Sequence, residues 1–308
     1  MPTRGRPVLA IRALEAVVPQ LDEGDELVVV DNGSPPEDVR RVEDWLNTHC
    51  RGARLVVEER EGVSAARNRA LEEATARVVC FIDDDVRVAP DWLRALRNAW
   101  ADAGPATAAI GGPMRPDWQA PRPTWLPDRA LFVLSVLDLG PERRRLDQQP
   151  GSGYLWGGNI SLRRDAAQAV GGFRSDTIYL ERVRPNVSSR VLTTARSGEE
   201  EDVQMRLAAA GWEVWYEPGA AVDHAIPPER VSEAFFRDFY RQLGFQQAMR
   251  GRSRAAGAAL IGWSALRYVV CRLLRRPDAR FSYFLAVQGW ALVRRLPRTG
   301  PPQTASHP

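Results

Sequence analysis

The sequence predicts an α/β fold whose mostly parallel sheet is flanked by helices over residues 1–228, followed by a basic, all-helical extension over residues 229–308. Two observations support this division. Up to about residue 115, short β-branched runs alternate with helical stretches, as in βαβ units. Beyond Pro228 only helical periodicity remains, and the charge changes sign: residues 1–224 carry 28 Arg and 35 acidic residues, whereas residues 225–308 carry 14 Arg and 4 acidic residues.

The basic and cysteine residues exclude several classes of site. All 42 basic residues are arginine, which excludes catalysis by a Schiff-base lysine and phosphate binding by a P-loop lysine. The three cysteines, Cys50, Cys80 and Cys271, have no CxxC spacing. This pattern argues against structural zinc and is typical of a reducing compartment.

Strands and helices alternate in the first third of the chain. The expected strands are Glu26–Asp31, Ala53–Glu58 and Arg77–Ile82. The expected helices run from Ser34 to about His49, from about Ser64 to Ala76, and onward from Pro90. Ser34 and Glu37 form the pattern of a capping box. Ligands of such sheets bind beyond the carboxyl ends of the strands, so Asp31 and the acids after Ile82 should face one site.

The middle of the chain is less regular. The expected elements are a strand with a long loop over Gly104–Thr124, an ordered stretch over Tyr154–Leu162 with a short helix after it that Gly171-Gly172 closes, a helix over Glu201–Ala210 and a last strand over Trp212–Tyr216. Ser197–Glu200 predicts a capping box ahead of the helix. His224 is expected beyond the last strand.

The extension contains three predicted helices, over Val231–Met249, Ala255–Leu274 and Phe281–Val293, with arginines on both sides of the last two. A helix in the headgroup region of an anionic membrane accommodates Arg267 better than a spanning helix, because an arginine in mid-bilayer costs about 2.5 kcal/mol or more. An ordinary soluble helical hairpin packed on the core is the alternative. A basic tail can also meet nucleic acid, but its apolar content favours a membrane, so we expect an anionic membrane surface and no nucleic acid as partner.

The triplet Asp83-Asp84-Asp85 follows directly after a predicted buried strand. Adjacent carboxylates repel one another, so the fold either leaves them solvated or compensates them with a cation. Asp83 and Asp85 can lie on the same side of an extended segment. They could then serve a hard divalent cation and a diphosphate together, whereas a loop of solvated acids is the alternative.

Two further residues suggest a nucleotide site. The carboxylate of Asp31 only accepts hydrogen bonds, which suits the N3–H of uracil or thymine or the N1–H edge of guanine. A plain Asx turn with Ser34 is the alternative. Arg67 stands in the first turn of a helix, where anions bind, and could reach a phosphate or a base; a solvated surface arginine is the alternative.

Acidic residues and a histidine near the end of the α/β region are less informative. Four acids, Glu199, Glu200, Glu201 and Asp202, open a helix whose dipole favours them, so only one would need to face a cleft. A lone histidine such as His224 is more often a packed or surface residue than a metal ligand.

Six motifs occur in one order: PTRGR at the start, VVVDNGS, GVSAARNRAL, FIDDDV, GGNISLRR with GGF, and EEEDVQMRLAAAGW with a trailing His. In this order they resemble family 2 glycosyltransferases of the GT-A fold, over about residues 2–230. The resemblance implies an enzyme that transfers a sugar, with inversion, from a nucleotide-diphosphate donor of the UDP, dTDP or GDP type to an acceptor hydroxyl. It also implies Mg²⁺ or Mn²⁺ as cofactor.

The resemblance further implies roles on the donor side. The matching residues are Pro2 and Thr3, which would border the nucleoside, followed by Asp31, Arg67, Asp83 and Asp84. Asp31 would read the base, and Arg67 would help to hold the base or the phosphates. Asp83 matches the first acid of the family's DxD motif, near the ribose and base. Asp85 matches the last acid, which holds the metal on the diphosphate, and His224 matches a histidine that can complete the metal site.

Roles on the acceptor side follow from the same resemblance. Asp202 matches the second acid of the family's ED pair and would be the general base that takes the proton of the acceptor hydroxyl. The residues that would line the acceptor side are Trp156, Gly158, Asn159 and Glu201.

The start of the chain departs from the family's pattern. Family members normally carry an apolar first strand before the PTRGR position, whereas this sequence begins with Met1-Pro2. We expect this strand to be missing or truncated and the natural start to lie upstream.

The leading hypothesis is a membrane-associated glycosyltransferase, cytoplasmic and peripheral on the inner face of the cell membrane, that acts on a lipid-linked or cell-envelope glycan. A non-catalytic nucleotide-sugar-binding protein is one alternative. A sugar-phosphate nucleotidyltransferase is another. Such an enzyme requires a Gly-rich loop and a catalytic lysine near the start of the chain, and neither is present.

Overall fold

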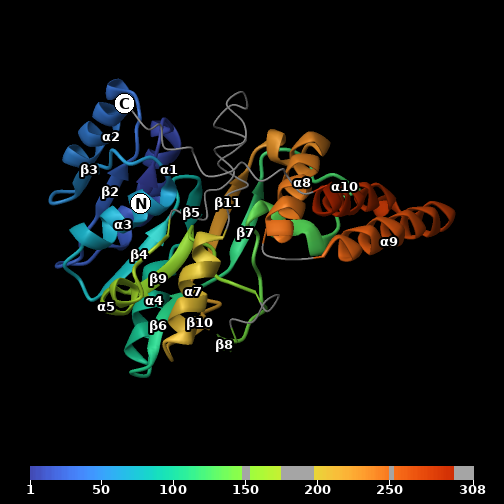
Figure 1. Ribbon diagram of the computed structural model, residues 1–308. Coiled ribbons are helices and arrows are strands. Elements are labelled where there is room, and N and C mark those ends of the chain that lie inside the picture. The colour runs from blue at the N-terminus through green and yellow to red at the C-terminus, as the bar shows by residue number, and fades with distance from the viewer. Residues whose placement is uncertain (148–152, 175–197, 250–252, 295–308) are drawn as a thin grey trace, which may run out of the picture. The chain divides into compact units, whose positions relative to one another are not determined.

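The computed structural model describes residues 1–147, 153–174, 198–249 and 253–294 (Figure 1). The chain forms two compact units. The first comprises Met1–Ala120 and Leu134–Pro227, and the second comprises Pro121–Val133 and Pro228–Pro308. The second unit therefore also includes a segment from the middle of the chain, which the sequence did not indicate.

The first unit contains three sheets. One has the order β1 (Pro2–Thr3), β2 (Val28–Asp31), β3 (Arg54–Val57), and all its strands are parallel. The second has the order β4 (Val78–Ile82), β9 (Asn159–Arg163), β6 (Thr107–Gly111), β10 (Glu213–Tyr216), β8 (Arg144–Leu146). The third has the order β5 (Val86–Val88), β11 (Val222–Ile226), β7 (Met114–Trp118).

The antiparallel pairs all involve strands that the sequence did not place or bounded differently. β9 runs antiparallel to both β4 and β6, β8 to β10, and β5 to β11, whereas β6 with β10 and β7 with β11 are parallel pairs. The strands predicted at the start of the chain, β2, β3 and β4, are confirmed to within two residues.

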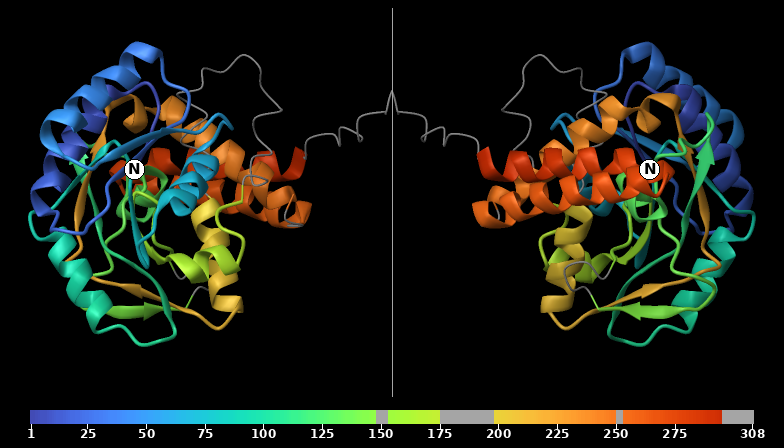
Figure 2. Two further views of the ribbon diagram at one scale, coloured as in Figure 1. Left: turned by 90° about the vertical axis from the view of Figure 1, so that its left-hand side faces the viewer. Right: turned by 90° about the vertical axis from the view of Figure 1, so that its right-hand side faces the viewer.

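Helices cover two faces of the first unit. The helices α1 (Pro7–Val17), α2 (Pro36–His49) and α4 (Trp92–Ala101) contribute to one apolar core. The helices α3 (Val63–Glu73), α5 (Arg164–Ala169) and α7 (Glu199–Ala209) contribute to the other. Figure 2 shows α1, α2 and α4 on the side away from α3 and α7. The carboxyl ends of the parallel strands and the first turns of α3 and α7 are therefore available to build a site.

The predicted capping boxes are wrong. The residue before α2 is Pro35, and no side chain caps this helix. Ser34 instead donates its hydroxyl to Asp31 and accepts a hydrogen bond from the backbone of Gly5 at 2.7 Å. The residue before α7 is Gly198, again without a side-chain cap, and Ser197 lies outside the described residues. At the start of α2, the carboxylate of Asp31 takes the Ser34 hydroxyl that would otherwise have capped the helix.

A short strand occupies the place where the sequence suggested a missing one. Pro2 and Thr3 of β1 pair in parallel with Val30 and Asp31 of β2. The backbone N–H of Val30 also donates to the carbonyl of Met1 at 2.9 Å. The carboxyl half of β2 is thus paired on both edges, with β1 on one side and β3 on the other.

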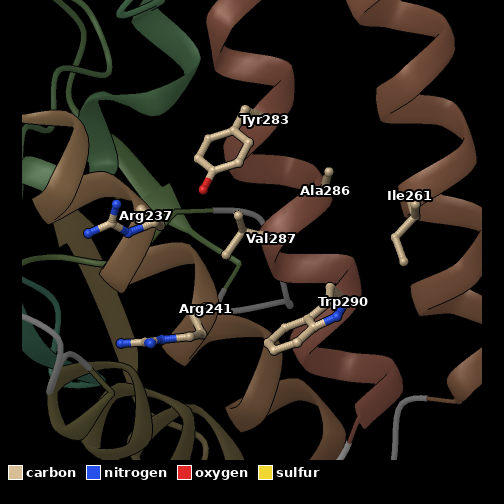
Figure 3. A pocket seen from close by; sticks show the side chains of 7 residues that line it. All are labelled: Arg237, Arg241, Ile261, Tyr283, Ala286, Val287 and Trp290. Carbon is tan, nitrogen blue, oxygen red and sulfur yellow. The ribbon is translucent and has the colours of Figure 1, made fainter.

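The second unit consists of helices. Its long helices are α8 (Glu233–Met249), α9 (Arg254–Leu273) and α10 (Phe281–Arg294), with a 3₁₀ turn at Pro277–Arg280. α10 packs against both α8 and α9. Figure 3 shows it between them, where the three helices line a shallow groove of about 440 Å³. The residues of this groove are Arg237, Arg241, Ile261, Tyr283, Ala286, Val287 and Trp290.

An aromatic cluster forms the core of the second unit. The Phe284 ring lies 5.3 Å from Trp125 and 5.8 Å from Phe236, measured between ring centroids, and its side chain is buried. Trp125 belongs to the segment from the middle of the chain, so this cluster explains why that segment joins the helices.

Arg267 has a different role from the one expected. Its side chain is only 13% exposed, donates to Asp278, and donates to the Ser282 hydroxyl at 2.7 Å. The interpretation of Arg267 as a headgroup-facing residue is therefore wrong, because this arginine ties α9 to α10 inside the hairpin. None of the helices within the described ranges is long and apolar enough to cross a membrane.

Phe284→Ala should lower the free energy of unfolding by about 3–5 kcal/mol, because it leaves a cavity among the aromatic rings. Urea unfolding followed by circular dichroism measures this. The neighbouring Tyr283 is 51% exposed, so Tyr283→Ala is the matched control and should cost less than about 1 kcal/mol. Equal losses in the two variants would contradict the proposed core.

Candidate active site

Polar residues gather at the carboxyl ends of β1, β2 and β4. Thr3 ends β1 beside Asp31, which ends β2. The Thr3 hydroxyl donates to Asp84 at 2.8 Å, immediately after β4. Thr3 therefore connects the end of β2 to the acidic triplet, as expected from strand ends that meet at one edge.

The acidic triplet forms a turn between β4 and β5 in which the middle acid points inward. Asp84 is buried, accepts hydrogen bonds from Thr3 and Arg6, and has its pKa raised to about 7, mainly by burial. Asp83 and Asp85 remain partly exposed. The expected placement of the outer two acids on one side of the segment stays a prediction. The sequence analysis grouped Asp84 with the donor-binding residues. In the structure, Asp84 is buried and anchors the turn through its bonds to Thr3 and Arg6.

Asp85 lies between a guanidinium and an imidazole. Arg6 Nη1 is 3.2 Å from Asp85 Oδ2, and His224 Nε2 is 3.7 Å from Asp85 Oδ1. His224 is a residue of β11, opposite Val86 of β5. The sequence placed it beyond the last strand, because the short run around it shows too little alternation to indicate β11. Strand pairing brings it next to Asp85.

Asp85 and His224 fit a divalent cation whose shell a substrate completes. No group of three or more His, Cys, Asp or Glu within the described ranges could hold a metal ion by itself. Mg²⁺ is commonly held by one or two carboxylates, with phosphate oxygens and water in its other positions. One carboxylate with an adjacent imidazole leaves room for the phosphate oxygens and water that complete such a shell.

Asp31 closes its own turn. Its side chain is buried, and Oδ2 accepts hydrogen bonds from the backbone of Gly33 at 3.2 Å and of Ser34 at 3.1 Å. This is the Asx turn that the sequence analysis named as the alternative to base recognition.

The Arg67 guanidinium is buried among three carboxyl groups. It lies 3.1 Å from Asp83, 3.0 Å from Glu200 and 3.4 Å from Glu199, and the arginine side chain is 2% exposed. The ring of Phe173 lies 5.5 Å from its central carbon. Arg67 therefore joins α3, the turn after β4 and the start of α7. Its expected contact with a base or a phosphate is replaced by contacts with acids.

Two adjacent glycines make room for this ion pair. A Cβ atom at Gly157 would collide with the Arg67 guanidinium, and a Cβ atom at Gly158 would lie 2.9 Å from an Asp83 oxygen. Gly158, expected on the acceptor side, thus lies against Asp83, and the GGN motif is explained by the space that the ion pair needs.

Asn159 faces the protein interior. Its amide donates to the carbonyls of Pro113 at 3.1 Å and Ala220 at 2.8 Å, and its oxygen accepts from the indole of Trp92 at 2.9 Å. The expectation that Asn159 lines the acceptor side is wrong, because these bonds occupy its side chain. Trp156, three residues earlier, is half-buried beside the same core.

The acids at the start of α7 divide into two groups. Glu199 and Glu200 are buried and reach Arg67, whereas Asp202 accepts two hydrogen bonds from Arg206, at 2.9 and 2.6 Å. Arg206 also donates to the carbonyl of Gly172 at 2.6 Å. Two helical residues span about 200° around the axis, so Glu200 and Asp202 point in nearly opposite directions. The structure brings Glu200, not Asp202, to the acids after β4, and Glu201 between them is partly exposed.

The extra negative charge around Arg67 is removed by a proton. Burial, followed by the neighbouring Glu200, raises the pKa of Glu199 to about 8. Glu199 therefore holds a proton at neutral pH, and Arg67 is left to balance Asp83 and Glu200. Glu200 Oε2 is buried and has no hydrogen-bond partner within the part of the chain that the structure describes. This oxygen is a buried acceptor whose hydrogen-bonding capacity is unused.

Comparison with known proteins identifies the family. Residues 1–171, more than half of the chain, match the family described as Glycosyl transferase family 2. The chain belongs to this family. As a family 2 member it is a glycosyltransferase, and the family resemblance drawn from the six ordered motifs is confirmed.

Several curated family 2 relatives resemble the chain. It is 31% identical over 169 residues to a glucosyl-dolichyl phosphate glucuronosyltransferase of Haloferax volcanii, over 53% of this chain and 50% of the relative. It is 28% identical over 253 residues to a pre-mycofactocin glycosyltransferase of Mycobacterium tuberculosis, over 78% of this chain and 47% of the relative. It is also 28% identical over 244 residues to the succinoglycan biosynthesis protein ExoM of Rhizobium meliloti. This match covers 76% of this chain and 68% of the relative. The chain thus spans about half the length of the first two relatives.

Solved structures share the GT-A fold. The mannosyltransferase PcManGT of Pyrobaculum calidifontis, solved with GDP-Man and Mn²⁺, superposes with a TM-score of 0.61 at 20% identity, over 95% of this chain and 84% of that chain. TarS of S. aureus, solved with UDP, superposes with a TM-score of 0.51 at 14% identity, over 95% of this chain and 88% of that chain. The predicted fold class is confirmed.

Glu199→Gln should make stability less dependent on pH. The unfolded chain releases the Glu199 proton near the usual pKa of 4.5, whereas the folded chain holds it up to about 8. Folding therefore loses stability as pH rises through this window, and glutamine removes that loss. Between about pH 5 and pH 8, the free energy of unfolding should fall in both proteins. The fall in the wild type should exceed the fall in the variant by more than about 1 kcal/mol.

The matched control is Glu43→Gln, since Glu43 is an exposed acid of α2. Urea titrations at each pH value provide the measurement. If Glu199→Gln and Glu43→Gln show the same pH dependence as the wild type, then Glu199 does not carry the extra proton.

Proposed function

We propose that this glycosyltransferase transfers a sugar, with inversion, from a nucleoside-diphosphate donor to a hydroxyl group of a lipid-linked or cell-envelope glycan, assisted by Mg²⁺ or Mn²⁺. The observation that carries the proposal is the buried guanidinium of Arg67, which holds Asp83 and Glu200 in one cluster. Inverting transfer needs a carboxylate that accepts the incoming hydroxyl's proton and a separate place for the leaving diphosphate.

The diphosphate end of the donor is assigned to Asp85 and its neighbours. Asp85 and His224 would hold the metal, which when bound supplies the positive charge that stabilises the leaving diphosphate. Arg6, beside Asp85, has a side chain that is 47% exposed, so it can also reach a diphosphate oxygen. The presence of Mn²⁺ in the solved PcManGT supports this assignment.

The nucleoside end is assigned to the strand ends. Pro2, Thr3 and Asp31 would border the nucleoside, with Asp83 on the ribose side. The donor nucleotide is proposed to be of the UDP, dTDP or GDP type, which agrees with the UDP and GDP-Man that the solved TarS and PcManGT contain. Asp31 would read the base only if the bonds of its Asx turn leave one lone pair available.

The proton acceptor is assigned to Glu200 instead of Asp202. Glu200 Oε1 is fixed by Arg67 at 3.0 Å, while the buried Oε2 has no hydrogen-bond partner among the described residues. A hydroxyl hydrogen-bonded to Oε2 would transfer its proton there as its oxygen attacks the anomeric carbon. Arg67 acts as a positioning residue, because it touches the carboxylates and not the substrate. Trp156 and Glu201 remain proposed acceptor-side contacts.

The acceptor class and the location are proposed from two independent features. The names of the Haloferax and Rhizobium relatives refer to a dolichyl phosphate and to succinoglycan, a lipid-linked and an envelope type of product. The second unit of this chain is basic and helical. Both support an enzyme at the inner face of the cell membrane, where nucleotide sugars are available in the cytoplasm.

Glu200→Gln should lower kcat by about 10²–10⁴-fold, because the amide cannot accept the proton. Donor affinity should change little, since glutamine keeps the hydrogen bond to Arg67. Release of nucleoside diphosphate with acceptor present measures kcat, and isothermal titration calorimetry measures donor binding. Asp202→Asn is the matched variant and should retain most activity. The base assignment fails if Asp202→Asn loses as much turnover as Glu200→Gln.

Asp85→Asn should weaken Mn²⁺ binding at least about tenfold, because it removes a charged ligand. Electron paramagnetic resonance of free Mn²⁺ in the presence of nucleoside diphosphate reports this without relying on turnover. Asp102 is an exposed acid of the same unit, so Asp102→Asn is the control and should bind as the wild type does. Unchanged Mn²⁺ binding by Asp85→Asn would contradict the metal assignment.

A further inference from the structure

An unusual apolar surface runs along α9. Seven large apolar side chains are exposed along it, and two of these, Tyr268 and Val269, lie outside the surface meant here. The other five have exposed fractions of 54, 65, 43, 77 and 65%: Trp263, Leu266, Val270, Leu273 and Leu274. Their spacing of three or four residues places them on one side of the helix. We call these five residues the apolar stripe. An exposed apolar surface of this size normally marks an interaction site.

The apolar stripe is not the side of α9 that packs within the protein. Gly257, Ser264 and Cys271 are buried and recur every seven residues, on a different side of the helix. Gly257 closely approaches the backbone of Gly289 in α10. The fold therefore uses one side of α9, and nothing within the described residues of the second unit buries the stripe.

The charges around the stripe select the kind of partner. Residues 254–294 contain seven arginines and a single acid, Asp278. Asp278 is buried and pairs with Arg129, Arg267 and Arg276. The arginines at the end of the stripe, Arg272, Arg275 and Arg276, are exposed, and neither α9 nor α10 carries an acid.

An anionic bilayer fits this combination better than a second copy of the chain. A second copy would bring its own arginines against these arginines, which repel one another. Lipid phosphates attract each surface arginine by about 1 kcal/mol, and the acyl boundary accepts leucine, valine and tryptophan side chains.

We infer that the apolar stripe of α9 inserts into the headgroup region of an anionic phospholipid bilayer, with the exposed Arg275 at its end bound to lipid phosphate. α9 then lies parallel to the membrane surface, with Arg267 facing away from the lipid toward Asp278. This inference rests on the membrane location proposed above and names the surface that makes the contact. It does not depend on the proposed reaction, because a failure of sugar transfer would leave the surface unchanged.

Co-sedimentation with vesicles tests the inference on the full chain. The wild type should bind vesicles of phosphatidylcholine with phosphatidylglycerol, and bind phosphatidylcholine alone at least about tenfold more weakly. The double variant Leu266→Glu with Leu273→Glu should lose at least about tenfold in binding to the anionic vesicles. Both leucines are more than half exposed, so their replacement should leave the fold intact, as circular dichroism can verify.

The control is Val8→Glu with Val57→Glu, which makes the same change of charge at exposed valines of the first unit, 46 and 54% exposed. This control should bind vesicles as the wild type does. A second readout is quenching by brominated lipid, part of which should disappear in Trp263→Phe.

Three results would overturn the inference. The first is equal vesicle binding by the wild type and the leucine double variant. The second is equal loss of binding in the valine control, which would show an effect of charge alone. The third is a dimer in sedimentation equilibrium that the leucine double variant converts to monomer, which would make a second copy the occupant of the stripe.

Discussion

The active-site region depends on one buried positive charge, the guanidinium of Arg67. A buried charge is tolerated only when it is paired and hydrogen-bonded, and three carboxyl groups from two other segments meet this need. The GGN loop leaves space for the charge at Gly157, where any side chain would collide with it. The helix α3, the turn after β4 and the start of α7 are thereby held together by one group.

This constraint gives the acids of the site different tasks. Glu199 carries a proton and completes the shell of Arg67, which leaves Glu200 as a fixed carboxylate with one oxygen that no described residue bonds. On the other side of the triplet, Asp84 is bound from within by Thr3 and Arg6, so Asp85 is presented outward next to a histidine. Two buried networks thus position the two acids that the proposed chemistry needs.

Local sequence signals predicted much of the fold but only part of the site. The strands β2, β3 and β4 and the long helices follow from periodicity. The strand β11 does not, because its short run alternates too weakly, and its partner lies far away in sequence. The choice between Glu200 and Asp202 could not be made from sequence, since the helix dipole favours every acid in a first turn. Arg267 was misjudged for a similar reason: its partner Asp278 becomes visible only when the hairpin has folded.

The pH dependence of kcat for Arg67→Lys tests the central claim most directly. Lysine keeps the charge but cannot hold several carboxylates at once. If Arg67 positions Asp83 and Glu200, kcat should fall by about 10²-fold, the acidic limb of the profile should move to higher pH, and the donor KM should change little. A raised donor KM with kcat and the acidic limb unchanged would show that Arg67 binds the donor instead, and would contradict the account.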